Sequence, residues 1–356
     1  MSYRTIAQPL LGGLSTLICI PVSLFICSLF DAETFGSWVA FTVICTTPMH
    51  MVLSLVWHYD YPLWLSRLGQ PTKGLVSLLI LALSALVVAP LGLHVAGGGI
   101  TPPSPFSLMY VILSVVTTLW LLVQFQCWPL AGWVRHPAAT GLGTLLLAYS
   151  LAWGLFQHAF DFQELQNAPF YIAELDPHGG FDAWDALSFA VTTAALIMAW
   201  VLFDFWPLRS IAQRWPLLNR QPLFGLLAGS LVLVWTGLIW YIGVNVLQLD
   251  VVEYLVRVPV PLLFGEFIIL LLFQNRLLHS IPQPLRGIGL AAISTVLAAM
   301  TQGLYARAGA WITGGLSAGG PLYQLELWLA SAMLAVTFPV MVAYSGGFAF
   351  WPFQRR

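Results

Sequence analysis

The sequence predicts an all-α polytopic membrane protein in which ten transmembrane helices form five co-oriented helical hairpins in a pseudo-five-fold ring. Composition, the length of the apolar runs and an internal repeat predict this fold. Of the 356 residues, 59% are hydrophobic and 8% are charged, whereas roughly a quarter of residues are charged in an ordinary soluble domain. No stretch resembles a separate soluble domain, so residues 1–356 are expected to form a single integral membrane domain.

Ten apolar runs reach the length of about 20 residues that a helix needs to cross a bilayer. Lipid offers no hydrogen-bond partners to the backbone, so runs of this length must be helical. The predicted spans are 9–30, 37–58, 75–95, 106–128, 141–160, 186–206, 223–247, 259–277, 287–305 and 324–351.

Two short motifs recur around these runs and define an internal repeat. The first closes a run as Phe203-Asp204-Phe205-Trp206-Pro207-Leu208, and the second opens one as Gln221-Pro222-Leu223-Phe224-Gly225. The copies delimit five hairpins at about 8–63, 70–130, 136–208, 221–278 and 283–353.

The motifs have a structural interpretation and a functional one. Proline fits the first turn of a helix, where its missing N–H would have no partner, and tryptophan favours the headgroup level of a bilayer. The functional interpretation is a polar vestibule in which Asp204, Gln126 and Gln274 occupy equivalent positions.

The charge distribution predicts the orientation of the chain. Eleven of the 13 lysines and arginines fall at the termini or in loops after even-numbered spans, which the positive-inside rule assigns to the cytoplasm. We therefore expect an integral protein of the bacterial cytoplasmic membrane with both termini cytoplasmic. The net charge of −1 makes nucleic acid an improbable partner.

The odd-numbered runs are richer in glycine, alanine and serine, which let helices approach closely in lipid. This composition predicts that the odd helices form the inner ring and the even helices the outer ring. A pore along the axis would then be gated by bulky side chains such as Phe25, Phe156 or Leu233. The long loop 161–185 is rich in aromatic residues and is a candidate docking surface for partner subunits.

Glu266 is the clearest intramembrane candidate, because an ionisable residue inside a span is costly and is a functional hypothesis by default. It would accept a proton, bind a cation or contact a quinol. The alternative is a carboxyl that is kept neutral by burial or paired with Arg257.

His50 lies in the middle of the second run, next to Pro48. It would bind a metal, a haem or a proton, or serve as a satisfied structural histidine. A haem normally takes a second axial histidine, and no second histidine lies within reach along the helix, so the sequence names no cofactor.

Three other histidines, His94, His158 and His178, share one face of the membrane with several acids. Together they are weak candidates for a zinc or copper site, although no HxH or HxxxH spacing supports one. The four cysteines show no paired spacing that would indicate a disulfide framework or a thiolate site.

Five co-oriented hairpins are similar in plan to the slow anion channel and tellurite-resistance transporter family, which builds a central pore from such a ring. This resemblance implies a channel or facilitator for a small solute or anion. The segment Arg257–Glu266 resembles a stretch in the quinol-interacting membrane subunits of molybdopterin oxidoreductase complexes. That resemblance implies the alternative, a non-catalytic or quinone-interacting subunit of a larger redox complex. A metal-dependent membrane enzyme remains a third possibility.

Overall fold

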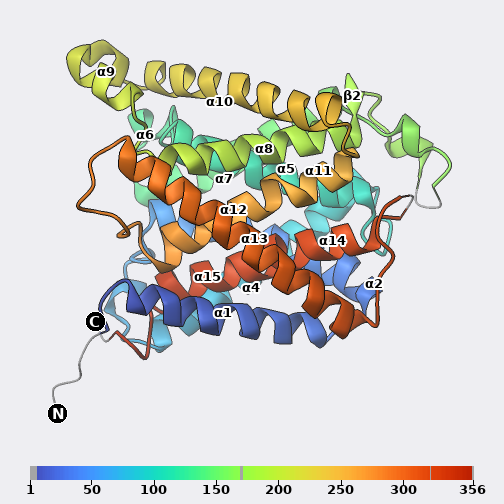
Figure 1. The fold of residues 1–356 in the computed structure, drawn as a ribbon, viewed down its shortest axis with the longest axis horizontal. Coiled ribbons are helices and arrows are strands. Elements are labelled where there is room, and N and C mark those ends of the chain that lie inside the picture. The colour runs from blue at the N-terminus through green and yellow to red at the C-terminus, as the bar shows by residue number, and fades with distance from the viewer. Residues whose placement is uncertain (1–5, 169–170, 321, 355–356) are drawn as a thin grey trace.

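A computed structural model describes residues 6–168, 171–320 and 322–354. It contains ten helices that are long and apolar enough to cross a membrane, lying alongside one another in a bundle (Figure 1). We number them as spans one to ten. They are Leu10–Ser28, Ala32–Val56, Thr72–Gly97, Pro105–Gln124, Pro137–Ala159, Ala183–Leu202, Leu223–Val246, Val251–Leu272, Leu285–Thr313 and Gln324–Gly347.

Five spans, namely the first, third, fifth, sixth and ninth, are single α-helices, and the other five combine α-helical and π-helical segments. The α-helices are α1 (Leu10–Ser28), α2 (Ala32–Thr34), α3 (Ala40–Met51), α4 (Thr72–Gly97), α5 (Pro105–Leu119), α6 (Leu130–Trp133), α7 (Pro137–Ala159), α8 (Ala183–Leu202), α9 (Leu208–Arg214), α10 (Leu223–Tyr241), α11 (Val251–Arg257), α12 (Pro259–Phe267), α13 (Leu285–Thr313), α14 (Gln324–Ala330) and α15 (Phe338–Val342). Two short parallel strands, β1 (Phe160–Asp161) and β2 (Phe181–Asp182), pair beside the sixth span.

The even-numbered spans form the interior of the bundle, so the prediction that the odd helices are inner is wrong. Between 56% and 72% of the residues in the apolar window of each even span are buried, against 22% to 39% in the odd spans. The odd spans present large apolar side chains outward, such as Leu17, Leu86 and Leu146, each 72% exposed. These are the surfaces that face lipid.

The small residues of the odd helices do mark close packing, but on one narrow stripe. In α1 the buried positions include Gly12, Ser15, Cys19 and Ser23, which recur every three or four residues along one face. Such a stripe lets an outer helix approach the inner helices closely. Composition alone does not reveal that the odd helices lie outside the even helices and direct this stripe inward against them.

Contacts between spans follow one cyclic rule. The even spans contact each other in the order two, four, six, eight, ten and back to two. Each odd span packs on the even span immediately before it in this cycle and on the even span before that one, so that α1 packs on the tenth and eighth spans. The third and ninth spans also contact the even span that follows them. The first span therefore lies beside the end of the chain, as Figure 1 shows for α1 and α15.

The two sequence motifs meet each other across this packing. The glycine of each motif that opens a run lies against the aromatic residue that begins a motif that closes one, as Gly12 does against Phe273, where an added Cβ would lie 2.5 Å from the ring. The corresponding pairs are Gly74 and Phe348, Gly141 and Trp57, Gly225 and Phe125, and Gly287 and Phe203.

The glutamine of the motif completes the contact with hydrogen bonds. Gln8 accepts from the N–H of Gly12 through Oε1 (3.1 Å), and its Nε2 donates to the carbonyl of Leu272 (2.8 Å), which directly precedes Phe273. The glutamines Gln70, Gln221 and Gln283 donate in the same way to Gly347, Gln124 and Leu202. We call each glycine, aromatic ring and glutamine together a clasp.

The third clasp reverses the direction of the bond. His136 replaces the glutamine, and the indole Nε1 of Trp57 donates instead to the carbonyl of Pro137 (2.8 Å). Trp57 occupies the position of the phenylalanine in this copy. It precedes Pro62 by five residues, whereas Phe203 precedes Pro207 by four, so the first copy aligns one residue earlier than Pro62 suggests.

The end of each even span explains the spacing of the repeat. Two consecutive left-handed residues follow the aromatic residue in all five copies: His58 and Tyr59, Gln126 and Cys127, Asp204 and Phe205, Gln274 and Asn275, and Ala349 and Phe350. A π-helical turn of five residues precedes it in four copies, at Val52–Val56, Trp120–Gln124, Ile268–Leu272 and Ala343–Gly347. The sixth span has no π turn before Phe203, so the segment that leads to this aromatic residue is one residue shorter than in the other even spans.

The fourth copy lacks Trp-Pro and uses Arg286 instead. This guanidinium donates to Asp204 Oδ2 (3.2 Å) at the end of the sixth span and to the backbone carbonyl and side chain of Asn275 at the end of the eighth. Gln283 also donates to Asp204 Oδ2 (3.0 Å). One side chain at the start of α13 thereby ties together the ends of two inner spans.

Candidate functional site: an apolar cavity between the even spans

A cavity of about 210 Å³ lies among the five even spans. Every even span contributes lining residues at two successive levels. The first level consists of Ile44, Ile112, Val191, Val260 and Ala335, and the second of Thr47, Val115, Ala194, Leu263 and Phe338.

These lining residues occupy equivalent positions in the repeat. In four spans the second-level residue stands ten positions before the aromatic residue of the clasp, as Leu263 does before Phe273. Ala194 stands nine positions before Phe203, because the sixth span lacks the π turn. The pseudo-symmetry of the sequence is therefore carried into the walls of the cavity.

The walls are almost entirely apolar. Among the described lining residues, the polar side chains are Thr47, Ser331 and Tyr323, and no aspartate, glutamate, lysine, arginine or histidine is present. An isolated ion would lose its hydration here without receiving a counter-charge, which is strongly unfavourable.

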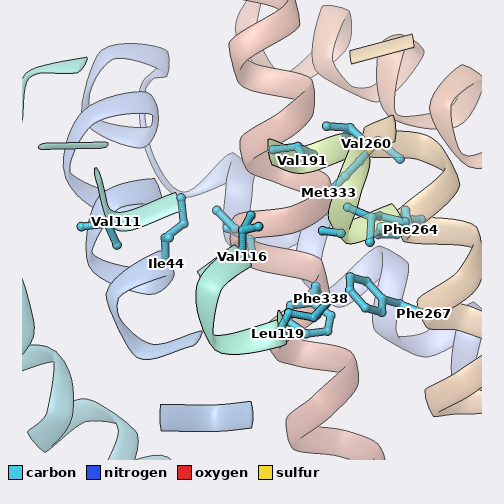
Figure 2. Close-up of a cluster of buried hydrophobic side chains, with 14 of the residues drawn as sticks. Ile44, Val111, Val116, Leu119, Val191, Val260, Phe264, Phe267, Met333 and Phe338 are labelled. Atoms are coloured by element: carbon cyan, nitrogen blue, oxygen red, sulfur yellow. The ribbon is translucent and has the colours of Figure 1, made fainter. Parts of the chain in front are cut away.

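Phe267 and Phe338 close the cavity at one end, where they stack with ring centroids 4.1 Å apart and planes at 28°. Figure 2 shows the two rings beside Leu119 of the fourth span. Met51, Leu119 and both phenylalanines line the cavity at this end. The stack therefore forms an aromatic constriction between neighbouring inner spans.

The other end of the cavity is covered by loop residues and by the starts of the spans. Trp184 and Tyr323 lie there with ring centroids 6.5 Å apart. The hydroxyl of Tyr323 donates to Asp250 Oδ2 (2.7 Å), while Asp250 Oδ1 accepts from Val252 and Glu253 at the start of α11. Burial and the bond to Asp250 raise the pKa of Tyr323 to about 12, so this phenol stays neutral.

A second pocket, of about 240 Å³, lies at the motif end of the bundle, by which we mean the end that carries the clasps. Its lining is polar and includes Ser54, His58, Gln274 and Ser345 from the second, eighth and tenth spans. Gln274 and His58 are each the first left-handed residue of their copies. Gln274 follows Phe267 by seven residues, or about 10 Å of helix rise, so this pocket lies beyond the constriction.

The other two predicted vestibule residues do not line this pocket. Asp204 is held by Arg286 and Gln283, and Gln126 is exposed at the end of the fourth span. Both keep the same backbone geometry as Gln274. The structure thus gives the three residues equivalent positions and brings one of them to a pocket.

Glu266 and His50 occupy equivalent positions, seven residues before the aromatic residue of their clasps. Their side chains are 5% and 2% exposed. Within the described part of the chain, neither ring nitrogen of His50 nor Oε2 of Glu266 has a hydrogen-bond partner. Arg257 pairs with Glu253 (3.2 Å) rather than with Glu266. Each stands one residue from a lining residue, Phe267 or Met51, without lining the cavity itself.

The candidate metal histidines separate in the structure. His178 approaches Asp176 (3.5 Å) and Asp161 (4.0 Å) in the loop before the sixth span, whereas His94 and His158 join no such group among the residues described. Asp176 already accepts from the N–H groups of Phe162 and His178 and from the hydroxyl of Tyr171. These bonds organise the loop 161–185, of which Pro169 and Phe170 lie outside the described residues.

The gate residues expected on odd spans do not face the axis. Phe25 and Leu233 are 64% and 48% exposed on the outer surface, and Phe156 is buried against Phe160 and Phe162. Phe267 and Phe338 were not among the predicted residues, because the repeat pattern by itself does not show that these two positions meet.

Comparison with known proteins identifies no relative: no protein-family profile, curated protein or solved structure matches the chain.

Proposed function

We propose that the protein is a membrane channel or facilitator for a small solute, with its path along the axis of a closed ring of five hairpins. The observation that carries this proposal is the cavity, to which all five even spans contribute equivalent residues at two levels. Because equivalent residues from all five repeats line the cavity, the cavity lies on the axis that the repeats surround.

The path would run from the cavity, past Phe267 and Phe338, to the polar pocket near Gln274 and His58. Apolar constrictions stop ions and polar solutes by excluding water. In this conformation the stacked rings would form the closed gate. Opening would require the rings to separate, which two side chains on adjacent inner helices can achieve by rotation or by a small helix shift.

The proposed orientation puts the motif end in the cytoplasm. That end carries Arg67, Lys73, Arg135, Arg209 and Arg214, whereas Asp31, Glu33 and Asp182 lie at the other end. The positive-inside rule then gives a cytoplasmic polar pocket and a cavity that lies nearer the outer face, beneath the covering residues at that end.

Flux through reconstituted liposomes tests the proposal. We expect the uncharged solutes acetic acid or urea to cross faster in liposomes that contain the protein than in empty ones, and Ala335→Phe, which fills the first level of the cavity, to abolish the difference. The matched control is Ala82→Phe on the exposed face of the third span. Equal rates for wild type and Ala335→Phe would remove the axis as the path.

The second candidate is a non-catalytic or quinone-interacting subunit of a larger redox complex. The exposed side chain of Phe181 (65%) in the loop 161–185 and the apolar cavity favour it. Purification in mild detergent distinguishes the two: co-purifying subunits or a haem absorbance band would support the second, and a homogeneous single species would support the channel.

A further inference from the structure

We infer that the apolar cavity is a binding site for a small uncharged ring-sized molecule that carries one hydrogen-bonding group, and that such a ligand occupies the proposed path. This inference goes beyond the proposed function, because a ligand held here would block the axis rather than cross the membrane. It rests on the size, walls and polar groups of the cavity.

The volume and walls define the size and polarity of the ligand. Apolar cavities of about 150 Å³ lined by leucine, isoleucine and phenylalanine stay dry and bind benzene or xenon. The present cavity, of about 210 Å³, has similar walls in Ile44, Val115, Leu263 and Phe338. Its size therefore admits a substituted six-membered ring, and its walls favour an apolar ring over water or an ion.

Two hydroxyl groups supply the polar contact. Ser331 lies on the tenth span and Thr47 on the second, and both line the cavity. The Thr47 hydroxyl makes only a long bond, of 3.4 Å, to its own helix at Val43. Ser331, which is 9% exposed, lines the cavity, and its side chain makes no hydrogen bond among the described residues. Buried hydroxyls normally have partners, so both are available to a ligand.

The covered end gives the ligand a route that does not cross the constriction. Leu165, Leu322 and Tyr323 cover the cavity from the connections between spans, and Trp184 covers it from the start of the sixth span. The side chain of Tyr323 is held by one hydrogen bond, to Asp250. Movement of loop side chains would admit a ligand from this end, while the stack of Phe267 and Phe338 stays closed.

The test uses fluorine NMR of the full chain in lipid nanodiscs with two probes, fluorobenzene and para-fluorophenol. Both should give a saturable bound signal that lipid-only nanodiscs lack. Ala335→Leu should weaken both probes at least about ten-fold by filling the cavity, whereas Ala82→Leu, the same change on the lipid face, should leave binding unchanged.

Ser331→Ala provides the specific readout. It should weaken para-fluorophenol about five-fold, the effect of one lost hydrogen bond, and leave fluorobenzene unaffected. Excess bromide should displace neither probe. Non-saturable signals, signals that survive in Ala335→Leu, or displacement by bromide would each overturn the inference.

The outcome is independent of the flux experiment. Binding of the probes without solute flux would retain the site and reject the channel. Flux blocked by Ala335→Phe without any probe binding would retain the channel and reject the site.

Discussion

Phe267 and Phe338 stack with their ring centroids 4.1 Å apart, although they come from different spans and different levels of the repeat. Phe338 stands ten residues before the aromatic residue of its clasp, and Phe267 stands six residues before its own. The equivalent positions hold smaller or aliphatic residues, including Thr47, Val115 and Leu119. The fourth and fifth copies thus break the pseudo-symmetry at the point where the cavity ends.

The clasp predicts opposite effects for two neighbouring glycines. An added Cβ at Gly12 would meet the ring of Phe273 at 2.5 Å, whereas nothing lies within 4 Å of one at Gly13. Gly12→Ala should therefore cost about 1–3 kcal/mol of stability through overpacking, while Gly13→Ala should be neutral or stabilise by up to about 1 kcal/mol because alanine favours helices. Thermal unfolding in detergent measures both, and equal effects would argue against the clasp.

Arg286 is predicted to hold the sixth and eighth spans together at the motif end. Arg286→Met leaves Asp204 without its cation and the carbonyl of Asn275 without this donor. We expect a loss of about 1–3 kcal/mol, seen as a lower unfolding temperature in detergent. Arg276→Met, at an exposed position nearby, is the control and should change little. If Arg286→Met is as stable as Arg276→Met, the contacts of Arg286 do not contribute to the stability of the protein.

Glu164 should make the loop 161–185 sensitive to pH. Asp182 is the main cause of the raised pKa of Glu164, whose ordinary value is 4.5, and burial adds to it. The folded state therefore binds this proton more tightly than the unfolded state, so repulsion destabilises the loop above the raised pKa and disappears as the pH falls below 4.5.

Glu164→Gln should accordingly stabilise the protein at neutral pH by no more than about 0.5 kcal/mol, as is usual for a surface site, and have no effect in acid. Hydrogen exchange of the loop amides at both pH values provides the measurement. High salt should reduce the neutral-pH gain, and a gain that persists in acid would exclude this electrostatic origin. Glu33→Gln, in the first connection, serves as the comparison.

The ten spans could be predicted from the sequence because length and apolarity alone decide which segments cross lipid. Some observed boundaries differ from the predicted ones. The eighth span was expected to begin at Pro259 but begins at Val251, because α11 continues into α12 through Val258. The repeat located the helix starts well, since the motif prolines Pro9, Pro71, Pro222 and Pro284 directly precede the first helical residue, and Pro137 is itself the first residue of α7.

The layer assignment failed because glycine and serine content does not distinguish a narrow packing stripe from an inner helix. A better signal was present in the positions of Glu266 and His50, which both fall on even spans. Polar residues inside a membrane face the bundle interior, and that rule would have placed the even spans inside.

The cavity could not be predicted from single segments. Its lining becomes regular only when the repeats are aligned on Trp57 and the four clasp phenylalanines, and the π turns that shift this alignment have no clear sequence signature. The aromatic constriction also depends on two side chains from different levels, which a repeat pattern treats as unrelated.

Solute flux through the double variant Phe267→Ala/Phe338→Ala in liposomes tests the central claim most directly. The account predicts flux of uncharged acetic acid or urea well above that of wild type, because the constriction between the cavity and the polar pocket is removed. Phe264→Ala, which truncates a buried ring packed on Tyr305 instead, should remain at the wild-type rate. A folded double variant with no more flux than wild type would contradict an axial path closed by these two rings.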